Sequence, residues 1–182
     1  ADIASMGGEL FVMDDGWFGD KYPRKNDSSS LGDWVVDKNK LPNGIEGLLS
    51  DAKKHGVKFG IWIEPEMANT TSELYEKHPD WVLKASERDV VLGRGGTQVV
   101  LDLANPAVQD FVFGVVDNLM TSYPEIDYIK WDANMSVQNH GSQYLTKDNQ
   151  SHMYIEFHRG FEKICQRIRA KYPDLTIQAC AS

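Results

Sequence analysis

The sequence predicts an α/β fold that forms part of a (β/α)8 TIM barrel. Three observations lead to this class. Short apolar runs of strand length alternate with longer amphipathic stretches along the whole chain, which is typical of βα units. The apolar runs end in polar or acidic residues, as barrel strands do where they present chemistry at their carboxyl ends. Neither a GxGxxG turn nor a P-loop follows the first run, which disfavours a nucleotide-binding open sheet.

The expected strands are apolar runs that each lead into polar residues. They span 9–14, 58–64, 98–103, 127–132 and 175–179. These strands amount to about five of the eight βα units of a complete barrel. Residues 1–182 are therefore expected to be a fragment of the catalytic barrel domain of a larger protein.

The amphipathic stretches between the strands are expected to be helices, at 44–55, 72–78, 106–123 and 151–172. Their ends carry recognisable signals. Asn105 is a typical N-cap, Pro106 suits a first helical position, and Gly56 follows the end of the first long helix. The order of strands and helices therefore favours parallel strands joined by helices.

Two connections are longer than the others, at 16–42 and 78–97. Loops of this length in a compact domain are usually either functional or disordered. The first is rich in charged residues, Gly and Ser, but it also contains Trp17, Phe18 and Trp34. These aromatic residues are expected to anchor it as an ordered active-site loop.

Composition excludes several partner classes. Asp and Glu number 27 against 19 for Lys and Arg, a net charge of −8, which argues against nucleic acid as a partner. No apolar stretch reaches the ~20 residues of a membrane span, so no membrane contact is expected. Two cysteines are too few for a disulfide framework, which favours a cytoplasmic location. Because the first residue is Ala, the natural N-terminus is expected upstream, and any targeting signal with it.

The segment YIKWDAN holds the first candidate site. Alternation along a strand places Lys130, Asp132 and Asn134 on one face. Polar groups that are buried together need partners or a ligand, and a lysine near Asp132 favours an ionised carboxylate, as a nucleophile requires. The alternative is a buried Lys–Asp ion pair that holds the sheet together. Spacing alone does not decide between the two.

The pair Asp14-Asp15 follows the first expected strand and precedes Gly16. At such a turn both carboxylates can bend toward one ligand, and carboxylates are strong acceptors for sugar hydroxyls. The alternative assigns one aspartate to the turn and the other to solvent.

The run GIWIEPEM and the loop LGRGGTQ hold the remaining candidates. Alternation predicts that Trp62, Glu64 and Glu66 share a face, which suits a sugar ring packed on an aromatic side chain beside carboxylates. The two glutamates are equally suited to accept hydrogen bonds from loop backbone. Arg94, in the second loop, is either a mobile surface charge or a clamp over the site.

These motifs occur together in a recognisable order. The segments FVMDDGWFG, LGDWVVDKNKLPNG, FGIWIEPEM, SELYEKHPDWVL, VLDLANP and YIKWDAN resemble the family 36 glycoside hydrolases, chiefly bacterial α-galactosidases, over nearly the whole chain. The resemblance implies a retaining enzyme that removes terminal α-linked galactose from oligosaccharides such as raffinose or melibiose by double displacement. It also implies that no metal or cofactor is required.

The resemblance assigns residues as well. It makes Asp132 the catalytic nucleophile, and it implies that Asp14 and Asp15 bind the C4 and C6 hydroxyls of galactose. The other residues that it implies in the sugar subsite are Trp62, Arg94, Lys130, Asn134 and, less directly, Cys180, where an additional residue interrupts the family's pattern. The general acid/base is expected beyond residue 182, so the isolated fragment is expected to lack activity.

Other functions stay open at this point. One is transfer of galactose to an acceptor sugar, or action on another α-glycoside, by the same fold. A second is a metal-dependent barrel enzyme in which Glu64, Glu66, Asp102 and Asp132 hold Mg²⁺. A third is a fragment that only binds sugar. The sequence also leaves open the oligomeric state of the longer protein, homo-oligomers included.

Overall fold

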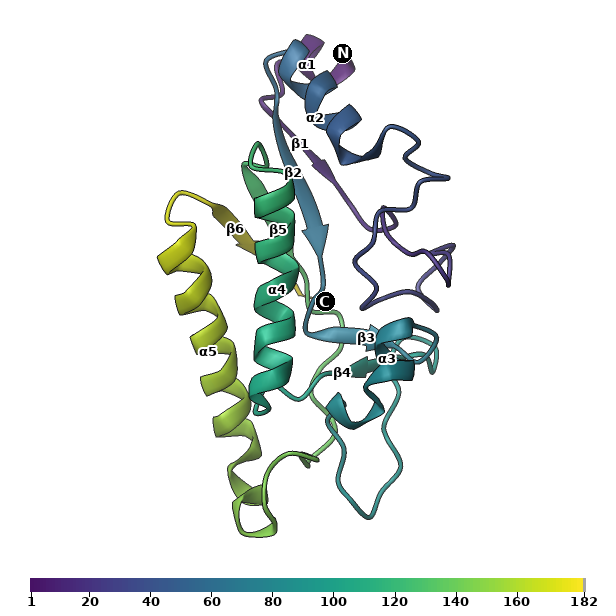
Figure 1. Ribbon diagram of the computed structural model, residues 1–182, viewed down its shortest axis with the longest axis vertical. Coiled ribbons are helices and arrows are strands. Elements are labelled where there is room, and N and C mark those ends of the chain that lie inside the picture. Colours follow the sequence, from purple (N-terminus) through teal and green to yellow (C-terminus); the bar gives the residue numbers. More distant parts are fainter. Residues whose placement is uncertain (182) are drawn as a thin grey trace.

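A parallel sheet forms the centre of the molecule. The computed structural model describes residues 1–181. The strands β1 (Leu10–Met13), β2 (Lys58–Ile63), β5 (Tyr128–Trp131) and β6 (Thr176–Ala179) form a four-stranded parallel sheet in the order β1-β2-β5-β6 (Figure 1). Trp62 is in register with Lys130, and Trp131 with Ala179. The α/β class and these four strands are therefore confirmed.

Helices connect the strands close to the expected positions. The α-helices are α1 (Asp2–Ser5), α2 (Gly44–Lys54), α3 (Glu73–Lys77), α4 (Pro106–Ser122) and α5 (Met153–Lys171), and the 3-10 helices are η1 (Pro79–Trp81) and η2 (Lys147–His152). Asn105 caps α4 by accepting a hydrogen bond from the backbone N–H of Ala107. The long helices α4 and α5 pack side by side against the sheet (Figure 1). No described helix is long and apolar enough to cross a membrane.

The expected strand at 98–103 does not belong to the parallel sheet. Its residues form β4 (Gln98–Val100), which pairs antiparallel with β3 (Met67–Asn69) in a separate two-stranded sheet. A parallel return to the sheet needs a long crossover, usually a helix, but α3 has only 5 residues. Consequently β2 pairs directly with β5, and the prediction of five parallel strands is wrong.

The core lies between the sheet and its helices. Ile61 and Ile63 of β2 and Val112 and Val116 of α4 are all fully buried. Such side chains supply about 1.5–3 kcal/mol each on burial, so this layer fixes the strands whose carboxyl ends carry the candidate site.

The long loop after β1 is ordered around aromatic side chains. Trp17 and Phe18 are fully buried and pack edge to face, with ring centroids 5.2 Å apart. The indole N–H of Trp17 donates a hydrogen bond to the carbonyl of Trp62, on β2. The prediction of an ordered loop is therefore confirmed.

Candidate active site

Polar side chains gather where the parallel strands end. Asp14 follows β1, Asp132 follows β5, and Cys180 follows β6. Parallel strands end at the same edge of a sheet, so the order β1-β2-β5-β6 brings these residues to one edge. Such an edge is where barrel enzymes place their chemistry.

Asp132 is at the centre of this group. Its side chain is buried, and Oδ2 accepts a hydrogen bond of 3.0 Å from the indole N–H of Trp62. Oδ1 accepts one of 3.0 Å from the backbone N–H of Ala133. Burial raises the pKa of Asp132, but the hydrogen bonds from Trp62, the Asn134 side chain, Ala133 and the Cys180 thiol outweigh it and hold the pKa below its usual range. The carboxylate is therefore ionised at neutral pH.

Lys130 pairs with Asp14 and not with Asp132. Its ammonium lies 2.8 Å from Oδ2 of Asp14, which joins β5 to the end of β1. Burial raises the pKa of Asp14, but the hydrogen bonds from Lys130 and from the Asp15 backbone N–H together outweigh burial, so the pKa is lowered overall. The hydrogen bond to Asp14 raises the pKa of Lys130. The alternative of a Lys130–Asp132 ion pair is thus wrong, and the hydrogen bonds to the Asp132 carboxylate keep it ionised.

Glu64 supports the turn that follows Asp132. It is 2% exposed, and Oε1 accepts hydrogen bonds from the backbone N–H of Asn134 and, at 3.1 Å, from the side-chain amide of Gln98. Burial raises the pKa of Glu64 despite these hydrogen bonds. One of the two interpretations of Glu64, an acceptor for loop backbone, is confirmed.

Glu66 does not share the face of Glu64. β2 ends at Ile63, so the alternation of a strand no longer holds across Pro65. Glu66 instead accepts a hydrogen bond of 2.7 Å from the indole N–H of Trp131, whose ring packs against Phe161 of α5. Burial raises the pKa of Glu66 to about 7. The prediction of one shared face is wrong for this residue.

Trp62 does not offer an open aromatic platform. Its side chain is 2% exposed, and its ring stacks parallel to that of Phe18 at a centroid distance of 6.1 Å. The loop after β1 therefore covers the ring, and Trp62 contacts the site through its N–H group.

Asp15 and Arg94 are joined to the site through residues that the sequence did not indicate. Arg24 donates to both oxygens of Asp15, at 3.0 and 2.6 Å, and is itself 5% exposed. Arg94 lies 2.7 Å from Asp27, which in turn lies 3.8 Å from Arg24. The only signal for Arg24 in the sequence is its place in the aromatic-rich loop, and no local pattern there predicts that it pairs with Asp15.

Comparison with known proteins places the chain in a family. The family model described as melibiase matches residues 1–182. The chain belongs to the melibiase family. Among curated relatives, it is 41% identical over 188 residues to a probable α-galactosidase C of Aspergillus flavus and 39% identical over 178 residues to α-galactosidase AgaA of Geobacillus stearothermophilus. These alignments cover 100% and 98% of this chain but 24% of each relative, so the chain spans about a quarter of their length.

Solved structures agree. The crystal structure of the α-galactosidase from Lactobacillus brevis superposes with a TM-score of 0.92 at 40% identity, over 99% of this chain and 23% of that one. A variant of the GH36 α-galactosidase AgaA from Geobacillus stearothermophilus in complex with raffinose gives a TM-score of 0.92 at 38% identity, over 99% of this chain and 24% of that one.

The carboxylates of the melibiase-family chain do not converge as a metal site. Asp102 accepts a hydrogen bond from the hydroxyl of Ser142, whereas Glu66 accepts one from the indole N–H of Trp131. Within residues 1–181, no three Asp, Glu, His or Cys side chains are placed to hold a metal ion. The four carboxylates considered as Mg²⁺ ligands are therefore not placed together as a metal site.

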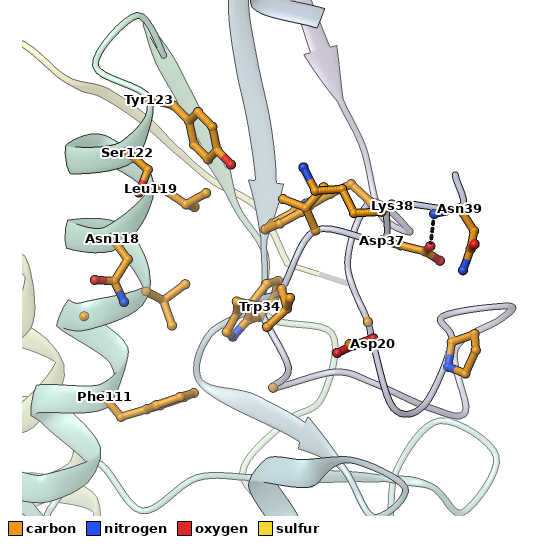
Figure 2. A pocket seen from close by; sticks show the side chains of 18 residues that line it. Asp20, Trp34, Asp37, Lys38, Asn39, Phe111, Asn118, Leu119, Ser122 and Tyr123 are labelled. Atoms are coloured by element: carbon orange, nitrogen blue, oxygen red, sulfur yellow. Dashed lines mark hydrogen bonds between the residues drawn. The ribbon is translucent and has the colours of Figure 1, made fainter. Parts of the chain in front are cut away.

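A separate cavity lies between the loop after β1 and α4. It has a volume of about 740 Å³, and Trp34, Phe111, Asn118 and Tyr123 are among the side chains that line it (Figure 2). The described lining includes none of the residues predicted for the sugar subsite. The cavity is thus distinct from the candidate active site of this family member.

Proposed function

We propose that the chain is part of a retaining α-galactosidase in which Asp132 is the nucleophile. The observation that carries the proposal is the buried carboxylate of Asp132, which Trp62 holds by a hydrogen bond and which has a lowered pKa. An ionised, oriented carboxylate at the carboxyl edge of a parallel sheet suits attack on an anomeric carbon. Membership of the melibiase family and relatives named α-galactosidases support the same reaction.

In the same proposal, residues 1–182 are a fragment of the catalytic (β/α)8 barrel domain of a larger glycosidase. The parallel order β1-β2-β5-β6, with helices between the strands, supports this assignment. The similarity to GH36 α-galactosidases over about a quarter of their chains agrees with it. The four strands correspond to half of the eight in a complete barrel.

The reaction proceeds by double displacement. The Asp132 carboxylate attacks the anomeric carbon and forms a galactosyl ester, while a second carboxyl group protonates the departing glycosidic oxygen. That group, now a carboxylate, takes a proton from water, and the resulting attack on the ester releases galactose and restores Asp132. In retaining enzymes the two groups stand about 5–5.5 Å apart. We place the second one beyond residue 182.

The sugar is held by the residues around Asp132. Asp14 and Asp15 accept hydrogen bonds from galactose hydroxyls, and Lys130 holds Asp14 in place. Arg94, Asn134 and Cys180 complete the subsite, and Trp62 contributes through its N–H group, which holds Asp132. The substrate class is oligosaccharides that end in α-galactose, such as raffinose or melibiose, and the relatives' crystal structures with raffinose and stachyose support this choice.

Labelling tests the nucleophile directly. The full-length enzyme is treated with an activated fluorinated galactosyl donor, digested, and the labelled peptide is sequenced. The proposal expects a galactosyl ester on Asp132, and none in Asp132→Asn, a variant of nearly equal shape. A label on any other residue of the wild-type enzyme contradicts the proposed mechanism.

A further inference from the structure

Two residues of the proposed sugar subsite, Asp15 and Arg94, come from different loops and lie 79 positions apart in the sequence. Asp15 directly follows Asp14 at the end of β1, whereas Arg94 precedes β4. Neither is fixed by its own strand. Some other part of the molecule must hold both side chains in place.

Arg24 holds the first of them. Its guanidinium donates to both carboxylate oxygens of Asp15, and its remaining nitrogen donates at 2.9 Å to the carbonyl of Ser29 and to the side-chain oxygen of Asn69. A two-point arginine–carboxylate pair fixes the plane as well as the position of the carboxylate. Because Arg24 is 5% exposed, solvent does little to weaken the pair.

Asn69 is the buried residue that supports Arg24. It is fully buried, and its side-chain oxygen also accepts from the backbone N–H of Leu31. Its side-chain nitrogen donates at 2.9 Å to the carbonyl of Asp27 and, at 3.4 Å, to Thr97. Asn69 thereby connects the loop after β1 with the loop that carries Arg94.

Asp27 completes the connection to Arg94. Its carboxylate lies 3.8 Å from Arg24 and 2.7 Å from Arg94. Arg94 adopts a left-handed backbone conformation, with φ of 45°, which is strained for a residue with a side chain. The hydroxyl of Thr97 donates to the carbonyl of Arg94 and helps to hold this conformation.

From these contacts we infer that Arg24 and Asp27 are positioning residues for sugar recognition: seated on Asn69, they hold the carboxylate of Asp15 and the guanidinium of Arg94 at fixed positions beside the substrate. The inference rests on the proposed α-galactosidase function. Neither residue touches the reacting atoms, so their loss is expected to weaken substrate binding more than turnover.

The test uses the full-length enzyme and compares Asp27→Asn with Asp110→Asn. Asp27 is 55% exposed, so its replacement does not endanger the fold. Asp110 of α4 is the matched control, because it is also exposed and also lies 2.7 Å from an arginine, Arg167 of α5. Asp27→Asn is expected to raise KM and the galactose Kd about twofold to fivefold, as for an exposed ion pair, with kcat unchanged. Asp110→Asn is expected to change none of these.

Two further variants sharpen the result. Arg24→Lys keeps the charge but cannot donate the two parallel hydrogen bonds to the Asp15 carboxylate, so KM is expected to rise about tenfold or more. In an Arg94→Ala background, Asp27→Asn is expected to have no additional effect. Unchanged KM and galactose Kd in both Asp27→Asn and Arg24→Lys would overturn the inference, as would a full Asp27→Asn effect without Arg94. Labelling of wild-type Asp132 is independent of these results and reports separately on the proposed function.

Discussion

The indole N–H of Trp62 lies 3.0 Å from Oδ2 of Asp132, across two neighbouring strands. The parallel pairing of β2 with β5 sets this contact, because Trp62 is in register with Lys130, two residues before Asp132. Phe18 stacks on the indole ring and fixes its orientation. The loop after β1 therefore acts on Asp132 through Trp62.

Replacing Trp62 with Phe tests this relationship. The variant keeps an aromatic ring but removes a hydrogen bond to a charged acceptor, worth about 1.5–3 kcal/mol. The pKa of Asp132 is then expected to rise, because the hydrogen bond from Trp62 is one of those that hold it down. Because the proposed double displacement needs the ionised form, the acid limb of kcat/KM against pH should move to higher pH by the same amount. The measurement is the pH profile of aryl α-galactoside hydrolysis by the full-length enzyme.

Trp34→Phe is the control for this prediction. Trp34 packs 6.2 Å from Trp62 in the same aromatic cluster, but its N–H has no hydrogen-bond partner among the described residues. Its replacement should leave the acid limb in place. Equal shifts in both variants would mean that aromatic packing, and not the hydrogen bond, sets the pKa of Asp132.

Glu64 is predicted to matter through its acceptor oxygen. Glu64→Leu removes the oxygen that accepts hydrogen bonds from the backbone N–H of Asn134 and from the side-chain amide of Gln98, so the turn after Asp132 loosens. We expect kcat to fall about tenfold to a hundredfold, because small displacements of catalytic groups are costly. Glu64→Gln keeps an acceptor oxygen and should retain most of the activity.

Glu66→Leu provides the comparison for Glu64→Leu. Both glutamates are buried and each accepts an indole or amide hydrogen bond, but Glu66 is bonded to Trp131, which packs toward α5. Glu66→Leu should lower the thermal unfolding midpoint while leaving kcat nearly unchanged. A similar loss of kcat in the two variants contradicts a specific role for Glu64.

Replacement of Asp14 is predicted to weaken galactose binding without lowering the stability of the fold. Its side chain is 62% exposed, and exposed ion pairs such as Lys130–Asp14 contribute only about 0–1 kcal/mol to folding. Asp14→Asn should therefore leave the unfolding midpoint almost unchanged. Galactose binding, measured by calorimetry on the full-length enzyme, should weaken about tenfold or more, because a charged hydrogen-bond acceptor is lost. Retained affinity would remove Asp14 from the proposed subsite.

Local patterns account for much of the fold that was predicted. Alternating apolar runs located β1, β2, β5 and β6, and capping signals located α4, because these features depend on neighbouring residues. The run at 98–103 was misassigned because apolar character reports burial and not the strand partner. It is buried in the two-stranded sheet of β3 and β4 as fully as a barrel strand would be.

The site was predicted less completely for a related reason. The candidates Asp14, Lys130 and Asp132 could be selected from their places at strand ends. The sequence did not indicate that Lys130 pairs with Asp14, which follows another strand. Glu66 does not lie on the same face as Glu64, because the strand ends before Pro65. Arg24 depends on Asn69, 45 positions away in the sequence, and no local pattern encodes such a contact.

Glu66 predicts a dependence of stability on pH. Burial raises its pKa from 4.5 to about 7, so the folded state holds a proton that the unfolded state has released between these values. The stabilisation is fully present below about pH 4.5 and is lost as the pH rises toward 7, by at most about 3 kcal/mol. Glu66→Gln, which keeps an acceptor for Trp131 but cannot ionise, should raise the unfolding midpoint at pH 8 and change it little at pH 5. Glu125→Gln, at an exposed position, should change neither midpoint. If Glu66→Gln behaves alike at both pH values, the carboxyl group of Glu66 does not titrate in this range.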